Sequence, residues 1–267
     1  MFKEFFKQYF TKLNIEGENN KLIWDKGFRE KKLHFKTPSF KLKIKGCNNH
    51  VILVGKLKKR ELSNSLAGLN LIVEGNNNTV KVEFPIRFQN TTICITNDDN
   101  LFSIKKTRHP IRQATFFIEG NNEVIIGQNS QLKNRGLYVV LNGNYKKRHK
   151  LVLGDNVYIA KDALIRTSDG HTLIDLNTNE PLSEPEDIII GNNVWITSKC
   201  TILKGTVLPD NCIVGACSLV NKKFIENNIL IAGTPAKIIR KNVTWSKYDY
   251  GEYMRNVKEK EITNETL

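Results

Sequence analysis

The chain has 267 residues, is 40% hydrophobic, and carries a formal net charge of +14 from 41 Lys and Arg against 27 Asp and Glu. No stretch approaches the roughly 18 apolar residues of a membrane span, and the first residues lack a signal-peptide pattern. The five cysteines are an odd number without CxxC spacing, so we expect a reduced, cytoplasmic protein without a zinc site.

The excess positive charge is spread over short runs, for example in residues 56–60 and 146–148. Three kinds of partner suit such a charge: nucleic acid, an anionic membrane surface, and anionic small molecules or glycans. Solvated loops without any partner are the alternative. Neither a nucleic-acid-binding motif nor interleaved aromatic residues accompany the charge, so we expect no nucleic-acid partner.

Residues 1–14 are predicted to form an N-terminal amphipathic helix or cap. Phe2, Phe5, Phe6, Tyr9 and Phe10 fall mostly on one side of a short helix. Such a helix either plugs the open end of a core or lies on a membrane surface. The second alternative would make the protein peripheral at the inner membrane.

Residues 15–150 contain a loosely spaced repeat. The segments 15–20, 44–49 and 73–78 share an aliphatic residue, a glycine and a pair of asparagines, and their glycines are 29 residues apart. Segment 118–122 is a shortened fourth copy. Because Gly and Asn tolerate positive φ, each copy predicts a tight corner between strands. We expect an irregular β-solenoid here, with a separate small β domain as the alternative.

A regular period of six residues marks residues 151–240. An aliphatic residue recurs at every sixth position, and the residue four positions after each of these is small or compact, except for Phe224. This period fits a triangular coil in which each side uses about six residues and buries one aliphatic side chain. Stacked coils then cover each other's apolar faces. The aliphatic positions in the clearest stretch are Ile190, Ile196, Ile202, Leu208, Val214 and Val220.

One insert, residues 168–187, interrupts this period. Gly170, Pro181 and Pro185 predict a loop that leaves the coil, and a break in a uniform repeat is a place to look for function. Residues 241–267 are predicted to form a C-terminal tail, in which the polar stretch 246–260 forms a short helix.

The sequence resembles the hexapeptide-repeat acyltransferases. The resemblance lies in the hexads, in the line IIIGNNVWITSKCTILKGTVLPDNCIVGACSLV and in the closing IAGTPAKIIR. The chain is similar to the galactoside and maltose O-acetyltransferases, and more similar to bacterial O-acetyltransferases that act on sialic acid of a capsule or lipooligosaccharide. The SDGH of the loop, Trp195 and the Val243–Trp245 tail carry that second likeness. It is strong over residues 150–245 and general over residues 1–149.

This resemblance implies an all-β fold, a left-handed parallel β-helix with a loop insert and short terminal helices. It also implies a homotrimer with active sites between neighbouring subunits, acetyl-CoA as co-substrate on the outside of the helix, and no metal. Parallel crossovers are right-handed as a rule, so the handedness comes from the resemblance and not from composition.

From the residues alone, His171 is either an ordinary loop histidine or a catalytic base, and the resemblance favours the catalytic base. Transfer of an acyl group to a hydroxyl needs a base with a pKa near neutrality, which histidine supplies. The family motif places the catalytic histidine at this position. Asp169 either orients the imidazole or caps the turn. The other histidines, His34, His50, His109 and His149, have no motif around them and are expected at the surface.

The resemblance also assigns binding residues. Trp195 is expected to point outward and to line the acceptor pocket, or else to pack against a neighbouring subunit. A backbone N–H on the outer face of the coil would stabilise the oxyanion. Thr197 and Thr234 stand where the family often has glycine and asparagine, which predicts altered contacts. The expected coenzyme contacts are Ser198, Gly215, Ala216, Asn221, Lys222, Lys237 and Arg240.

Three functions compete. The first is an O-acetyltransferase that acts on an anionic surface glycan bearing sialic acid, which the positive charge favours. The second keeps the chemistry and takes a neutral sugar, an antibiotic or an amino sugar nucleotide as acceptor. The third is a non-catalytic β-helix binding protein, against which the position of His171 argues.

Overall fold

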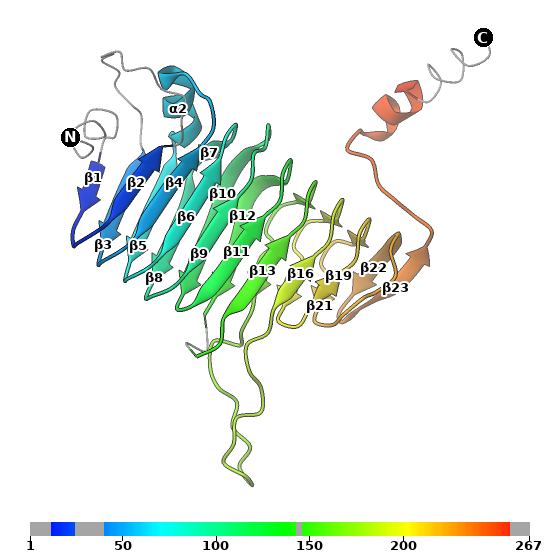
Figure 1. Cartoon of the computed structure of the whole chain (residues 1–267). Coiled ribbons are helices and arrows are strands. Elements are labelled where there is room, and N and C mark those ends of the chain that lie inside the picture. The colour runs from blue at the N-terminus through cyan, green and yellow to red at the C-terminus, as the bar shows by residue number, and fades with distance from the viewer. Residues whose placement is uncertain (1–11, 25–39, 143–145, 257–267) are drawn as a thin grey trace.

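The computed structural model describes residues 12–24, 40–142 and 146–256. In it the chain winds into a tube of parallel strands, stacked coil upon coil along one axis (Figure 1). The strands of residues 12–142 and those of residues 149–241 belong to the same sheets.

The tube has three faces, which we name A, B and C. Face A contains β1 (Lys12–Ile15), β3 (Lys41–Lys45), β5 (Leu69–Glu74), β8 (Thr91–Thr96), β15 (Leu164–Arg166), β18 (Thr201–Leu203) and β21 (Leu219–Val220). Face B contains β2 (Lys21–Trp24), β4 (His50–Val54), β6 (Thr79–Glu83), β9 (Leu101–Ile104), β11 (Asn122–Ile126), β13 (His149–Leu153), β16 (Ile188–Ile190) and β19 (Val207–Leu208). Face C contains β14 (Tyr158–Ile159), β17 (Trp195–Ile196), β20 (Ile213–Val214), β22 (Ile229–Gly233) and β23 (Ala236–Lys241).

Two long strands, β10 (Pro110–Glu119) and β12 (Gln131–Leu141), join faces C and A. The start of β12 pairs with β14 and its end with β15, and β7 (Arg87–Gln89) pairs with the start of β10. The strand pairs that build the tube are parallel except for the last, in which β23 runs antiparallel to β22. Three corners, A/B, B/C and C/A, connect the faces in every regular coil.

The six-residue period sets the core, as predicted. The aliphatic positions from Ile190 to Val220 are at most 1% exposed, and the residues four positions later, from Val194 to Phe224, are at most 6% exposed. Cys200 and Cys212 lie in this second set, and burial raises the pKa of the Cys212 thiol to about 12. These two cysteines therefore fill the core instead of acting as nucleophiles.

The glycine and asparagine copies form corners, also as predicted. Gly17 and Gly46 have φ of +99° and +102°, and a Cβ at either would come within 2 Å of the carbonyl oxygen of the next copy. A column of buried asparagines lies beside them, in which each side-chain oxygen accepts the backbone N–H of the next asparagine. Its members are Asn49, Asn78, Asn100 and Asn122.

Three features differ from the predictions or extend them. Residues 12–14, predicted as part of the N-terminal helix or cap, form strand β1 instead, and residues 1–11 lie outside the described part of the chain. Helix α2 (Lys59–Leu66) was not predicted; Leu62 and Leu66 are buried one helical turn apart. In the tail, residues 250–256 are helical. No helix among the described residues is long and apolar enough to cross a membrane.

Candidate active site

The insert leaves the tube at the A/B corner, between β15 and β16, and projects away from it (Figure 1). It folds into a hairpin, because Leu182 donates its N–H to the Leu173 carbonyl at 2.8 Å and Ile174 pairs antiparallel with Pro181. His171 lies at the start of this arm with an exposed side chain. Its position is thus set by how the arm is attached to the tube.

Asp169 attaches the arm to the next coil. Its carboxylate pairs with the Lys204 ammonium and accepts a hydrogen bond from the Ser183 hydroxyl at 2.8 Å. Both contacts lower the pKa of Asp169 below its ordinary value, and the contact with Lys204 has the larger effect. Within the described residues the carboxylate makes no hydrogen bond to His171. The role of Asp169 in orienting the imidazole stays a prediction.

The other end of the arm is fastened to face B. Glu186 donates its N–H to the Thr167 carbonyl at 3.0 Å, and Asp187 accepts the N–H of Lys150 at 3.0 Å. The same Asp187 oxygen lies 3.7 Å from Nδ1 of His149. The two ends of the insert are therefore held together where they meet the tube.

The expectation that His149 lies at the surface was wrong. Its side chain is 2% exposed, and its Nε2 has no hydrogen-bond partner within the described residues. Burial lowers the pKa of this histidine, against a smaller opposing effect of Asp187. His149 aligns with Asn122 in the register of β13 on β11, so it continues the buried asparagine column. That register was the available signal, because His149 follows the last asparagine copy by one coil. Of the other three, His34 lies outside the described residues, and His50 and His109 are half-buried.

Trp195 lies on face C and is covered by the tail of its own chain. Its ring centroid is 5.8 Å from that of Trp245, which is also 6.0 Å from Tyr158. Trp245 donates its indole N–H to the Asn193 carbonyl at 2.7 Å, so the tail is fixed over this face. The indole nitrogen of Trp195 is buried without a partner among the described residues. The packing role of Trp245 was missed, although its position in the tail was part of the resemblance.

Ser198 and Ala216 stack in successive coils at the C/A corner. Cys217 donates its N–H to the Ser198 carbonyl at 3.0 Å, which fixes their register. The N–H groups of Ser198 and Ala216 have no partner within the described residues and remain available to a ligand. Gly215 has a structural reason to be small, because a Cβ there would lie 2.8 Å from the Cβ of Ala232 in the next coil.

The remaining predicted coenzyme residues divide between two places. Asn221 and Lys222 are exposed at the A/B corner, two coils beyond the attachment of the arm. Lys237 and Arg240 are exposed on β23, the last strand of face C. His171, Asn221 and Lys222 therefore share one corner, whereas Ser198 and Ala216 share another. Face A lies between these two corners in a single chain.

These features define a parallel β-helix whose regular coils follow a six-residue period and whose candidate site is divided between two corners. Across the described part of the chain, no group of three His, Cys, Asp or Glu side chains is arranged to hold a metal ion. The arrangement offers an exposed histidine, two backbone N–H groups without a partner in the described part of the chain, and basic side chains.

Comparisons with known proteins agree with this class. No protein-family model matches the chain. A polysialic acid O-acetyltransferase of Escherichia coli O1:K1 / APEC is 29% identical over 137 residues, which are 51% of this chain and 42% of that protein. The galactoside O-acetyltransferase of Escherichia coli strain K12 is 33% identical over 141 residues, which are 52% of this chain and 64% of that protein. The matches thus span less than two thirds of either relative.

A solved structure, that of the polySia-specific acetyltransferase NeuO, superposes with a TM-score of 0.66 at 22% identity and covers 92% of this chain and 99% of that chain. This likeness concerns the fold, and it confirms the left-handed parallel β-helix that the family resemblance implied. The resemblance to the hexapeptide-repeat acyltransferases is confirmed as well.

Proposed function

We propose that this protein is an acetyl-CoA-dependent O-acetyltransferase that modifies a carboxylated bacterial surface glycan such as polysialic acid. The relatives and the fold favour this activity. The observation that carries the proposal is the division of the candidate site between the A/B corner with its arm and the C/A corner, where two backbone N–H groups have no partner within the described residues. Such halves suit a reaction site that forms between two copies of the chain.

The arm supports a homotrimer in which each hairpin lies against a neighbouring subunit. Its apolar side chains are exposed in the single chain: Leu176 is 96% exposed and Leu182 is 61% exposed. Exposed apolar groups of this kind mark contact surfaces. Residues 168–187 hold six carboxylates and no Lys or Arg, in a chain with a net charge of +14. An acidic arm thus complements the basic remainder of a second copy.

In the reaction, an acceptor hydroxyl oxygen attacks the thioester carbonyl carbon of acetyl-CoA. His171 takes the hydroxyl proton as the C–O bond forms and returns it to the departing thiolate as the C–S bond breaks, so acid and base chemistry balance on one imidazole. Lys204 and Ser183 hold Asp169, two residues before this histidine. Asp169 therefore fixes the backbone that carries the base.

The C/A corner of a neighbouring subunit supplies the other half. The N–H groups of Ser198 and Ala216 have no partner within the described residues and belong to regular coils, so either could donate to the coenzyme or to the oxyanion with little reorganisation. Gly215 has no side chain, so an extended ligand could lie close to the backbone at this corner. Lys237 and Arg240 would bind the phosphates of the nucleotide. Asn221 and Lys222, at the A/B corner, would also contact the coenzyme. Trp195, beside the C/A corner, borders the space for the acceptor.

The test is release of free thiol from acetyl-CoA with a panel of acceptors: polysialic acid, a neutral polysaccharide, and chloramphenicol. Wild type should acetylate polysialic acid, and His171→Asn should lose at least about 100-fold in kcat, within the range for general base catalysis. Acetyl-CoA binding by calorimetry should be unchanged in this variant. Equal activity of wild type and variant would contradict the role of His171. Preference for a neutral acceptor would contradict the acceptor class alone.

Complementation tests the shared site. Mixed trimers made from His171→Asn and Ser198→Pro chains should recover activity that neither homotrimer has, because some interfaces then combine two intact halves. Lack of recovery, with mixed trimers demonstrated by mass spectrometry, would contradict a site formed between copies. A monomer in sedimentation experiments would do the same.

A further inference from the structure

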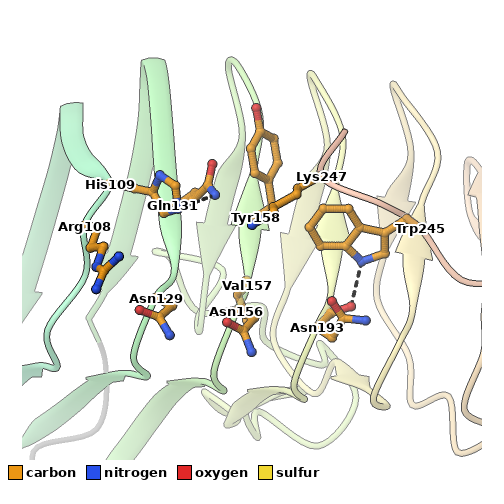
Figure 2. Close-up of a pocket in the computed structure, with 10 residues that line it drawn as sticks. All are labelled: Arg108, His109, Asn129, Gln131, Asn156, Val157, Tyr158, Asn193, Trp245 and Lys247. Atoms are coloured by element: carbon orange, nitrogen blue, oxygen red, sulfur yellow. Dashed lines mark hydrogen bonds between the residues drawn. The ribbon is translucent and has the colours of Figure 1, made fainter. Parts of the chain in front are cut away.

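A polar cleft runs along face C on the N-terminal side of Trp195. Its volume is about 460 Å³, within the range of about 300–1,000 Å³ usual for ligand pockets. Figure 2 shows the tail residues Trp245 and Lys247 on one side and Arg108 and His109 on the other. The floor between them is formed by outward residues of successive coils.

The floor repeats with the coils of the tube. Gln131 and Tyr158 are register partners on neighbouring strands, and Trp195 follows Tyr158. Strands in a sheet are about 4.8 Å apart, so these side chains form a straight row along the tube axis. Trp245 closes the row at one end, because it packs on both Tyr158 and Trp195. The cleft is therefore elongated and points away from the coils that carry Ser198 and Ala216.

The lining suits a charged carbohydrate. The side-chain amides of Asn129 and Asn156 and the Tyr158 hydroxyl have no hydrogen-bond partner among the described residues, so they can bind ligand hydroxyls. Tyr158 and Trp245 offer aromatic surface for the apolar side of a sugar ring.

The charges in the cleft are of one sign. Arg108 and Lys247 are exposed cations at its two sides, and Lys247 also lies over the Tyr248 ring at 5.3 Å. No Asp or Glu is among the described residues that line the cleft. Cations that face a site without acidic groups favour carboxylates, and Arg binds them with fixed geometry.

We infer that this cleft binds carboxylated sugar units of the acceptor chain beyond the unit that is acetylated. The inference rests on the proposed function for the identity of the acceptor. It gives the glycan and the coenzyme opposite approaches along the tube, with the glycan toward the N-terminal coils and the coenzyme toward the C-terminal ones. Longer acceptors would then bind more tightly than short ones.

The test compares oligosialic acid of six units with its methyl ester, which has the same shape without the negative charges. Binding is measured by calorimetry for wild type, for Arg108→Gln with Lys247→Gln, and for Lys41→Gln as an exposed control on β3. Wild type and the control should bind the acid at least about ten times more tightly than the ester. The double variant should bind both equally weakly. If the double variant preferred the acid over the ester by the same factor as wild type does, the inference would be overturned.

Kinetics separate this inference from the proposed function. The double variant should raise KM for the six-unit acceptor about tenfold. A parallel rise in KM for acetyl-CoA, or dissociation of the trimer, would show that the cleft serves the coenzyme or the subunit contact and would overturn the acceptor assignment. Charge-dependent binding in a wild type that transfers no acetyl group would contradict the proposed function and leave the binding site standing.

Discussion

Removal of the Lys204 ammonium group should loosen the arm that carries His171. Lys204 is 16% exposed and Asp169 is 39% exposed, so their pair lies between a buried and a surface ion pair. A surface pair contributes about 0.2–1 kcal/mol and a hydrogen bond to a charged group about 1.5–3 kcal/mol. Because half-exposure weakens the pair, we expect about 1–2 kcal/mol for Lys204→Met. That corresponds to about 5- to 30-fold in the opening equilibrium of the arm.

Hydrogen exchange and kinetics measure this effect. Amides of residues 172–183 should exchange faster in Lys204→Met, and kcat/KM for acetyl transfer should fall by up to the same factor, mainly through kcat. Lys204→Arg should restore both values because it keeps the charge near Asp169. Lys105→Met, at an exposed lysine on another corner, is the matched control. Unchanged exchange in the arm of Lys204→Met would refute the attachment that we describe.

Three further changes probe the tube itself. Gly215→Ala should cost about 1–3 kcal/mol in urea unfolding through overpacking against the Ala232 Cβ at 2.8 Å, and Gly215→Ala with Ala232→Gly should recover most of it; an additive loss would contradict the clash. Ile202→Ala should cost about 2–5 kcal/mol because Ile202 is fully buried, whereas Ile225→Ala, at a residue 88% exposed, should change stability by less than about 0.5 kcal/mol. His149 has a lowered pKa in the fold, so stability should fall as pH drops below about 6.5, where the unfolded histidine takes up a proton first; the same slope in His149→Asn would contradict this.

The six-residue period predicted the regular coils because each buried position is decided locally. Ile190 and its successors point inward for the same steric reason in every coil, so a single sequence carries the pattern several times. The corner glycines were equally readable, because Gly17 and Gly46 meet a carbonyl oxygen that excludes any side chain. Helix α2 gave a weaker signal, since its buried face consists of only Leu62 and Leu66.

The resemblance named several candidate residues of the site but not how they are arranged. The resemblance singled out His171 and Ser198, yet the six-residue period alone does not show that these two residues lie at different corners of the tube. That follows from counting faces along the coils, which needs the register of the strands. The contact of Asp169 with Lys204 joins residues 35 positions apart. The docking of Trp245 joins it to Asn193, 52 positions away. No local sequence pattern indicates either of these two long-range contacts.

The antiparallel strand β23 affects whether another chain can add to the end of the stack of coils. A stack of parallel coils ends in a strand with unpaired N–H and C=O groups, onto which another coil can add without limit. Here the chain turns back after β22 and covers that strand with β23, whose outer residues from Lys237 to Lys241 are exposed and include three cations. Charged edge strands discourage further pairing. On face C, the repeat that permits further stacking therefore ends in a segment that blocks the pairing of another coil.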